Sequence, residues 1–158
     1  MRHPVLVAAG FVLVSACSSS SPTTFTLEGA SVDRTYYCPG GANNSAYDLH
    51  ATVNVHNGTG KAVTIESVTA QMTVASVKGP WIEKVGERYN ADGVKFAPAS
   101  VAAGRGSSLK LTIPSACTSG KYGTGTSSSA DYNVTVHLAT SAGTFAITAA
   151  NQHEIVAD

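Results

Sequence analysis

The sequence predicts an all-β domain, built as two packed antiparallel sheets with about seven strands. Three observations support this fold class. Short runs of alternating apolar and polar residues recur along the chain, turn-forming residues separate them, and β-branched residues are common whereas Leu, Glu and Lys are few. No run alternates a strand with a long amphipathic helix, so an α/β fold is excluded.

The clearest strand covers residues 47–56, where one parity is apolar: Tyr47, Leu49, Ala51, Val53 and Val55. The turn residues Asn57-Gly58-Thr59-Gly60 follow and tolerate positive φ, which predicts a hairpin to the next strand, at 62–74. In that strand the apolar parity changes after Ile65, so we expect a β-bulge near Glu66-Ser67.

The other strands are predicted from the same alternation. A first strand begins at Phe25 and changes parity at a bulge at Gly29. Later strands cover 109–113, ending at Pro114, then 132–138, and a last strand from 145 to 155 after a tight turn at 141–143. The arrangement resembles an immunoglobulin-like sandwich in architecture, although the Cys…Trp…Cys spacing of antibody domains is missing.

The beginning of the chain has the features of a secretory leader. One basic residue, Arg2, precedes an uncharged run over residues 5–16, too short for a transmembrane helix of roughly 20 residues. The run ends in Val14-Ser15-Ala16-Cys17, which resembles the lipobox of bacterial lipoproteins. That resemblance implies cleavage after Ala16 and a diacylglyceryl group on Cys17. The alternative is an ordinary secreted protein with a free Cys17.

The resemblance implies three segments: a lipoprotein signal peptide at 1–16, a lipid-anchored flexible tether at 17–24, and the sandwich at 25–158. It places the protein on a bacterial cell membrane, held by lipid and facing away from the cytoplasm. It also accounts for the odd cysteine count, since Cys38 and Cys117 then remain as a structural disulfide pair. Two buried free thiols are the alternative.

Charge and motifs exclude several functions. Without Arg2 the chain has nine basic and ten acidic residues, a net charge of −1, so no basic field for nucleic acid exists. His50 and His56 are six residues apart on one face, too far to share an ion, and His153 is expected to be a hydrogen-bonded structural residue. No catalytic set, metal site or cofactor motif is found, and we predict that the protein is not an enzyme.

The segment 78–96 is the one charged stretch of the chain. We expect short strands at 81–85 and 94–96 around a turn at 90–93, with a helix at 81–89 as the alternative. Its aromatic and charged residues form a candidate binding surface: Trp81, Arg88, Tyr89 and Phe96. The alternative is a solvated edge whose aromatic residues cap the core. Tyr122, in the Gly/Ser-rich loop, is a second candidate.

The sequence thus predicts a non-enzymatic binding or structural domain, anchored to the membrane through Cys17, with an envelope protein as the expected partner. The alternatives are a carrier of a small ligand or metal, and an accessory subunit of an envelope enzyme.

Overall fold

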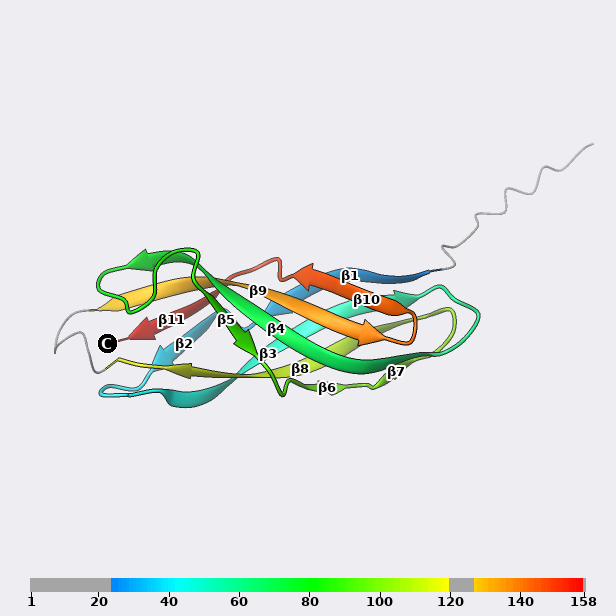
Figure 1. Ribbon diagram of the computed structural model, residues 1–158, viewed down its shortest axis with the longest axis horizontal. Helices are drawn as coiled ribbons and strands as arrows, with labels where there is room; N and C mark the ends of the chain where they lie inside the picture. Colours follow the sequence, from blue (N-terminus) through cyan, green and yellow to red (C-terminus); the bar gives the residue numbers. More distant parts are fainter. Residues whose placement is uncertain (1–23, 120–126, 158) are drawn as a thin grey trace, which may run out of the picture.

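The computed structural model describes residues 24–119 and 127–157, which form a β-sandwich. The described residues contain eleven strands and no helix (Figure 1). The leader, Cys17, most of the tether and Tyr122 lie outside the described residues. The predicted all-β fold class is confirmed.

The first sheet has four strands in the order β1-β3-β8-β6. Their bounds are β1 (Phe25–Val32), β3 (Ser45–Asn57), β8 (Arg105–Cys117) and β6 (Lys95–Ala97). All neighbours are antiparallel. The register of β1 against β3 shifts between Leu27 and Gly29, which confirms the bulge expected at Gly29.

The second sheet has the order β2-β11-β9-β4-β5, with β10 also paired to β9 and β7 to β4. Its strands are β2 (Thr35–Cys38), β11 (His153–Ala157), β9 (Ser128–Thr140), β4 (Val63–Lys78), β5 (Arg88–Ala91), β10 (Gly143–Thr148) and β7 (Ser100–Val101). Only the pair β2–β11 is parallel. The bulge expected near Glu66-Ser67 is confirmed by a register shift between Ile65 and Ser67.

The strand order is that of an immunoglobulin-like sandwich. In immunoglobulin lettering the first sheet reads A-B-E-D and the second A′-G-F-C-C′, with β10 and β11 as two parts of strand G. The inward-facing residues of both sheets meet in one core, which includes these fully buried side chains: Leu49, Val53, Leu109, Ile113, Val134 and Val136. The apolar residues that alternate with polar ones along the long strands are therefore buried on the inner face of each sheet.

The predicted hairpin after residue 56 is wrong, because β3 and β4 belong to different sheets. None of residues 57–60 has positive φ. The Asn57 side chain is instead fully buried, and its amide donates to the carbonyl oxygens of Lys61, Val101 and Ala102. The residue stabilises a crossover between the sheets rather than a two-residue turn.

The predicted strand end at Pro114 is also wrong, since β8 continues to Cys117. The short β6 pairs only with residues 110–112, so β8 is an edge strand at Pro114. A proline is tolerated there because no neighbouring strand needs its missing N–H. The predicted number of strands was too low for a related reason: β2, β5, β6 and β7 have two to four residues each, too few to show alternation.

The sandwich has two distinct ends, which β3 connects. Asn57, at the end of β3, pairs with Phe25, where the described chain begins. Ser45, at its start, pairs with Cys117. Thirteen residues at about 3.4 Å each put these two ends about 40 Å apart. In Figure 1 the chain enters β1 at one end, and the end of β8 lies at the other.

Candidate binding pocket

The loop at 79–87 lies at the Cys117 end of the sandwich, between β4 and β5. Gly86 N–H donates to the Val74 carbonyl, which returns the loop to β4, and Glu87 N–H donates to the Lys84 carbonyl, which closes a turn within the loop. Its positive φ values fall on Gly79 and Gly86, as expected for tight reversals. The strand predicted at 81–85 is absent, and so is the alternative helix, because these local bonds replace regular structure.

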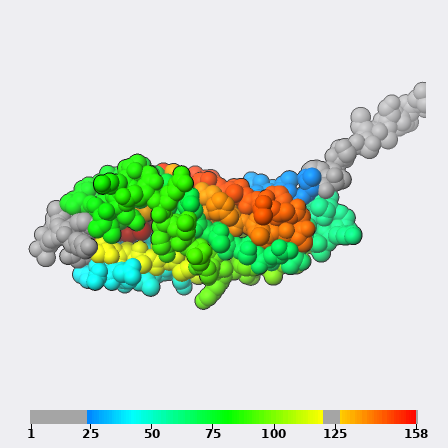
Figure 2. Space-filling view, viewed as in Figure 1, coloured from blue at the N-terminus to red at the C-terminus, as the bar shows by residue number. Residues whose placement is uncertain are grey.

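This loop forms one wall of a pocket between the two sheets. The cavity has a volume of about 160 Å³, with the end of β8 as its opposite wall. The buried side chains of Met72 and Ile155 contribute to its lining. Figure 2 shows the hollow between the green loop and the yellow end of β8, with the dark red of β11 visible inside it. The pocket therefore opens into the space between the sheets.

Three polar side chains of the lining are hydrogen-bonded to one another. The Tyr132 hydroxyl donates to Glu83 Oε2, and Trp81 Nε1 donates to the Tyr132 oxygen at 3.1 Å. Trp81 Nε1 also approaches Glu83 Oε2 at 3.4 Å. Glu83 and Trp81 come from the loop and Tyr132 from β9, so the cluster holds the loop against the second sheet.

Tyr89 closes another side of the pocket. It lies on β5, opposite Met72 of β4, and its hydroxyl donates to the Pro114 carbonyl at 3.4 Å. Ser115 Oγ donates to the Met72 sulfur at 3.8 Å, a second link between the two sheets. Tyr89 keeps 42% of its surface exposed, so its side chain borders both pocket and solvent.

The electrostatics of Tyr132 follow from its position. Burial raises the pKa of its hydroxyl well above the ordinary value, and the hydrogen bond to Glu83 and the charge of that carboxylate raise the pKa further. The phenol therefore stays protonated at any physiological pH and continues to donate to Glu83. The Tyr132 hydroxyl is therefore a stable hydrogen-bond donor and not a tyrosinate that could act as a base.

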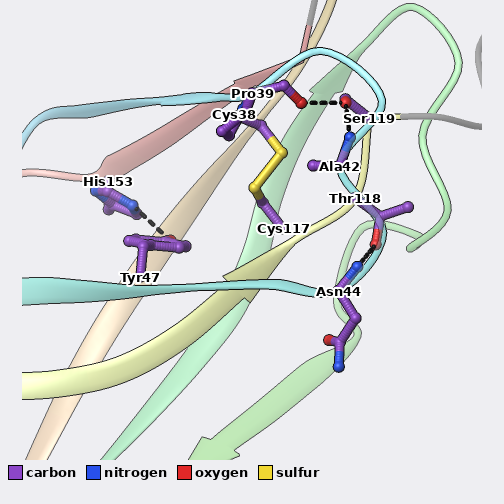
Figure 3. The surroundings of a disulfide bond; sticks show 9 residues. All are labelled: Cys38, Pro39, Ala42, Asn44, Tyr47, Cys117, Thr118, Ser119 and His153. Carbon is purple, nitrogen blue, oxygen red and sulfur yellow. Dashed lines mark hydrogen bonds between the residues drawn. A yellow bond between two sulfur atoms is a disulfide. The ribbon is translucent and has the colours of Figure 1, made fainter.

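A disulfide joins Cys38 and Cys117 beside the pocket (Figure 3), as the cysteine count predicted. It connects the end of β2 in one sheet with the end of β8 in the other, at a Cα separation of 6.0 Å. Ser119 Oγ donates to the Pro39 carbonyl and Ser119 N–H to the Ala42 carbonyl. These bonds fix the wall that Cys117 contributes to the pocket.

A buried histidine lies near the disulfide but does not line the pocket. His153 is 1% exposed. Its Nδ1 donates to the Asp33 carbonyl at 2.8 Å, so Nε2 accepts from the Tyr47 hydroxyl at 2.9 Å (Figure 3). Burial lowers the pKa of His153 and raises that of Tyr47 to about 12. The prediction that His153 is a hydrogen-bonded structural residue is confirmed.

The four residues of the predicted binding surface do not lie together. Trp81 and Tyr89 line the pocket. Arg88 is exposed on β5, and Phe96 is half-buried on β6 against the core. Neither of these two lines the pocket.

No group of three or more His, Cys, Asp and Glu side chains in residues 24–119 and 127–157 is placed to hold a metal ion. Within the same ranges, no helix has the length and apolar character needed to cross a membrane.

The sequence did not predict two of the three residues of the polar cluster. Glu83 was predicted only as part of the charged segment 78–96, and Tyr132 only as the first residue of the strand at 132–138. The two are 49 residues apart, and nothing in the spacing joins them. The one available signal was that Glu83 follows Trp81 by two residues, so both can face the same side of an extended loop.

Comparison with known proteins identifies no family. No family model and no curated protein matches the sequence. Among solved structures, the chain is similar to the ASH/PapD-like domain 7 of human CEP192, with 10% identity, a TM-score of 0.28, and coverage of 98% of this chain and 96% of that one. It is also similar to AggA, the major subunit of aggregative adherence fimbriae type I from Escherichia coli, with 10% identity, a TM-score of 0.32, and coverage of 84% and 93%. The class assigned here, an immunoglobulin-like sandwich with a small inter-sheet pocket, rests on strand order and geometry.

Proposed function

We propose that the protein is a lipid-anchored bacterial envelope protein whose sandwich binds a ligand in the pocket between its sheets and catalyses no reaction. The observation that carries the binding function is the pocket itself. It lies between the two sheets, and its lining includes the end of β8 at Cys117, which a disulfide joins to β2.

The arrangement of the pocket supports binding rather than catalysis. Its titratable side chains are Glu83, Tyr89 and Tyr132. Glu83 is engaged by two donors, and burial keeps Tyr132 protonated. Ser115 donates to Met72 and has no base beside it in the described lining. These groups can orient a ligand.

The anchor is supported by the lipobox-like residues and by the disulfide, which occupies Cys38 and Cys117 and leaves Cys17 as the remaining cysteine. We expect the intact mass of the membrane-extracted protein to show a diacylglyceryl addition and the loss of residues 1–16. A Cys17→Ala variant should lose the lipid and the membrane retention. Retention of both by that variant would overturn the anchor.

The binding function is tested by photo-crosslinking in intact cells. A crosslinking side chain at Ile82, which lines the pocket and is 52% exposed, should give a discrete adduct. The matched control is the same side chain at the exposed Lys61, at the opposite end of the sandwich. Equal labelling from both positions, or none from Ile82, would contradict binding at the pocket.

A further inference from the structure

The strand β5 forms one edge of the second sheet. It pairs with residues 70–73 of β4, and no other strand of residues 24–119 and 127–157 pairs with its second side. An edge strand presents unpaired N–H and C=O groups, through which a sheet can continue into another chain. The open side of β5 is therefore a candidate surface for strand pairing.

The backbone groups on this open side follow from the pairing with β4. Val74 N–H donates to the Glu87 carbonyl just before β5 begins, and the same register continues without a shift along the strand. Hydrogen-bonded and non-hydrogen-bonded pairs alternate along an antiparallel ladder. Tyr89 is therefore bonded to β4, whereas the N–H and C=O groups of Arg88 and Asn90 point away from it.

The open side lies far from residues 120–126. Asn90 pairs with Gln71 on β4, which pairs with Thr135 on β9. Thr135 is seven residues from Ser128, or about 24 Å along β9. Seven residues that leave and rejoin the pocket end of the sandwich cannot extend that far and return. The edge at Asn90 is therefore accessible to a second chain.

Two other edges of the sandwich are closed to such pairing. At β1, the Asn151 side chain accepts from the Val32 N–H and donates to the Val32 carbonyl, which occupies the outward groups of that residue. At β6, Lys95 begins the strand and Pro98 follows it, and both residue types discourage strand pairing. The strand β5 contains neither lysine nor proline.

Opposite charges lie four residues apart at the open edge. Arg88 begins β5, and Asp92 directly follows its last residue, with the same parity as Asn90. Both charged residues are exposed, and neither forms an ion pair with another described residue. Four residues of extended chain span about 14 Å, so these two side chains cannot pair with each other within one chain.

A second copy of the same strand satisfies both charges. When two β5 strands pair antiparallel with Asn90 opposite Asn90, Arg88 of each copy lies opposite Asp92 of the other. Opposite charges across strands stabilise a pair, and like charges destabilise it. A register shift of two residues removes the match, and a shift of four places Arg88 opposite Arg88 or Asp92 opposite Asp92. The charges therefore favour one register.

Exposed apolar side chains lie beside the same strand. Ile82 is 52% exposed, Val85 63% and Tyr89 42%, all within eight residues of sequence. Clustered apolar surface of this kind marks interaction sites. In the register set by the charges, Tyr89 lies opposite Ala91 of the second copy in a non-hydrogen-bonded pair, where side chains approach most closely. Pairing would therefore cover part of the exposed ring.

We propose that β5 is a self-association edge, which pairs antiparallel with β5 of a second copy and joins the second sheets of two sandwiches. The two-fold axis passes between the two Asn90 residues, perpendicular to the sheet. Both N-termini then leave the dimer at the same height along this axis, which suits two copies held by one membrane. The dimer contact goes beyond the proposed ligand binding and does not depend on it.

A cysteine at the two-fold axis tests the contact. Hydrogen-bonded residues on antiparallel strands have Cα atoms about 5.5 Å apart, within the range of roughly 4.4–6.8 Å that disulfides span. The full-length Asn90→Cys variant, mildly oxidised in membranes, should form a disulfide-linked dimer. Thr35→Cys, exposed on β2 at the opposite edge of the same sheet, is the matched control and should stay monomeric. Equal yields from both positions, no dimer from Asn90→Cys, or an adduct with a different protein would overturn the proposal.

Charge exchange tests the register. In the Asn90→Cys background, Arg88→Glu places like charges opposite each other at both ends of the contact and should lower the dimer yield about tenfold. Adding Asp92→Arg restores opposite charges and should restore the yield, whereas Lys61→Glu, exposed at the other end of the sandwich, should have no effect. Circular dichroism checks that each variant is folded. If the double exchange does not recover the dimer, the register and the proposal with it are refuted. Arg88 and Asp92 do not line the pocket, so crosslinking from Ile82 in the monomeric variant tests ligand binding separately.

Discussion

The two ends of the sandwich close the same core by different means. At the end where the chain enters, the buried Asn57 side chain donates to three carbonyl oxygens and accepts from the Thr59 N–H. At the far end, the disulfide of Cys38 and Cys117 joins the sheets and a cavity of about 160 Å³ remains beside it. Hydrogen bonds of one buried side chain hold the first end together, whereas a covalent bond joins the two sheets at the second end and a pocket lies beside it.

Among the changes at the two ends, removing the disulfide should cause the largest loss in the free energy of unfolding. The double variant Cys38→Ala/Cys117→Ala releases a cross-link between residues 79 apart. The chain-entropy model gives a loss of about 4.5 kcal/mol in the free energy of unfolding. Urea denaturation measures the loss, with the dithiothreitol-reduced wild type as a control for the substituted side chains. A loss below about 1 kcal/mol would show that the pocket end is held by its other contacts.

Substituting Asn57 should be the next largest change, at the opposite end. Asn57→Ala leaves buried carbonyl oxygens without their donor, and we expect a loss of about 3 kcal/mol. Asn54→Ala, on the same strand but exposed and bonded only to Ser108 among the side chains, should cost less than about 1 kcal/mol. Equal melting temperatures for the two variants would contradict the role given to Asn57.

Two glycines with similar backbone conformation, one at each end, allow the packing of the two ends to be compared. Gly79, at the pocket end, has φ +70° and Gly104, at the other, has φ +65°. A Cβ at Gly79 would lie 3.2 Å from Ser127 O and Ser128 Cβ, while one at Gly104 meets nothing within 4 Å. Gly104→Ala should therefore cost about 1 kcal/mol and Gly79→Ala about 2 kcal/mol. Chemical denaturation tests the order, and the reverse order would be inconsistent with close packing at Gly79.

The pH dependence from His153 should be the smallest effect. Burial lowers its pKa below the ordinary value of 6.5, so in the window below 6.5 the unfolded chain binds more protons than the folded one. The neutral imidazole therefore contributes its full stability above pH 6.5 and loses it as pH falls through that window. We expect a lower free energy of unfolding at pH 5.5 than at 7.5 in urea. The difference should shrink in His153→Gln and persist in His50→Gln, which changes an exposed residue.

Strand identity was predictable where a strand is long and buried on one face. In β3, β8 and β9, alternation within residues 47–56, 109–113 and 132–138 gave the correct inward faces, and parity changes located the bulges at Gly29 and Glu66-Ser67. A second shift, between Val74 and Ser76, was missed because the alternation was assigned only as far as Val74. The connection after Asn57 was mispredicted because turn propensity does not reveal whether a side chain will be buried.

The pocket was predictable only in part. The aromatic residues of the charged segment 78–96 were predicted to form a binding surface. Two of them, Trp81 and Tyr89, line the cavity. Glu83 and Tyr132 could not be paired from sequence, because their contact depends on how the loop at 79–87 folds over β9. Arg88 and Phe96 share the segment with Trp81 but face elsewhere, since alternate residues of the short strands point in opposite directions.

The separation of the two ends has a mechanical consequence. A ligand held at the pocket and a membrane holding the N-terminus would pull on β1 nearly along its own axis, because Phe25 pairs with the last residue of β3. Such a load shears the β1–β3 hydrogen bonds together instead of opening them one by one. The disulfide protects the far end of the path, since Cys117 terminates the neighbouring strand β8. The resistance of the domain to tension is then set by the β1–β3 pairing, and its lifetime under load by the unfolding rate.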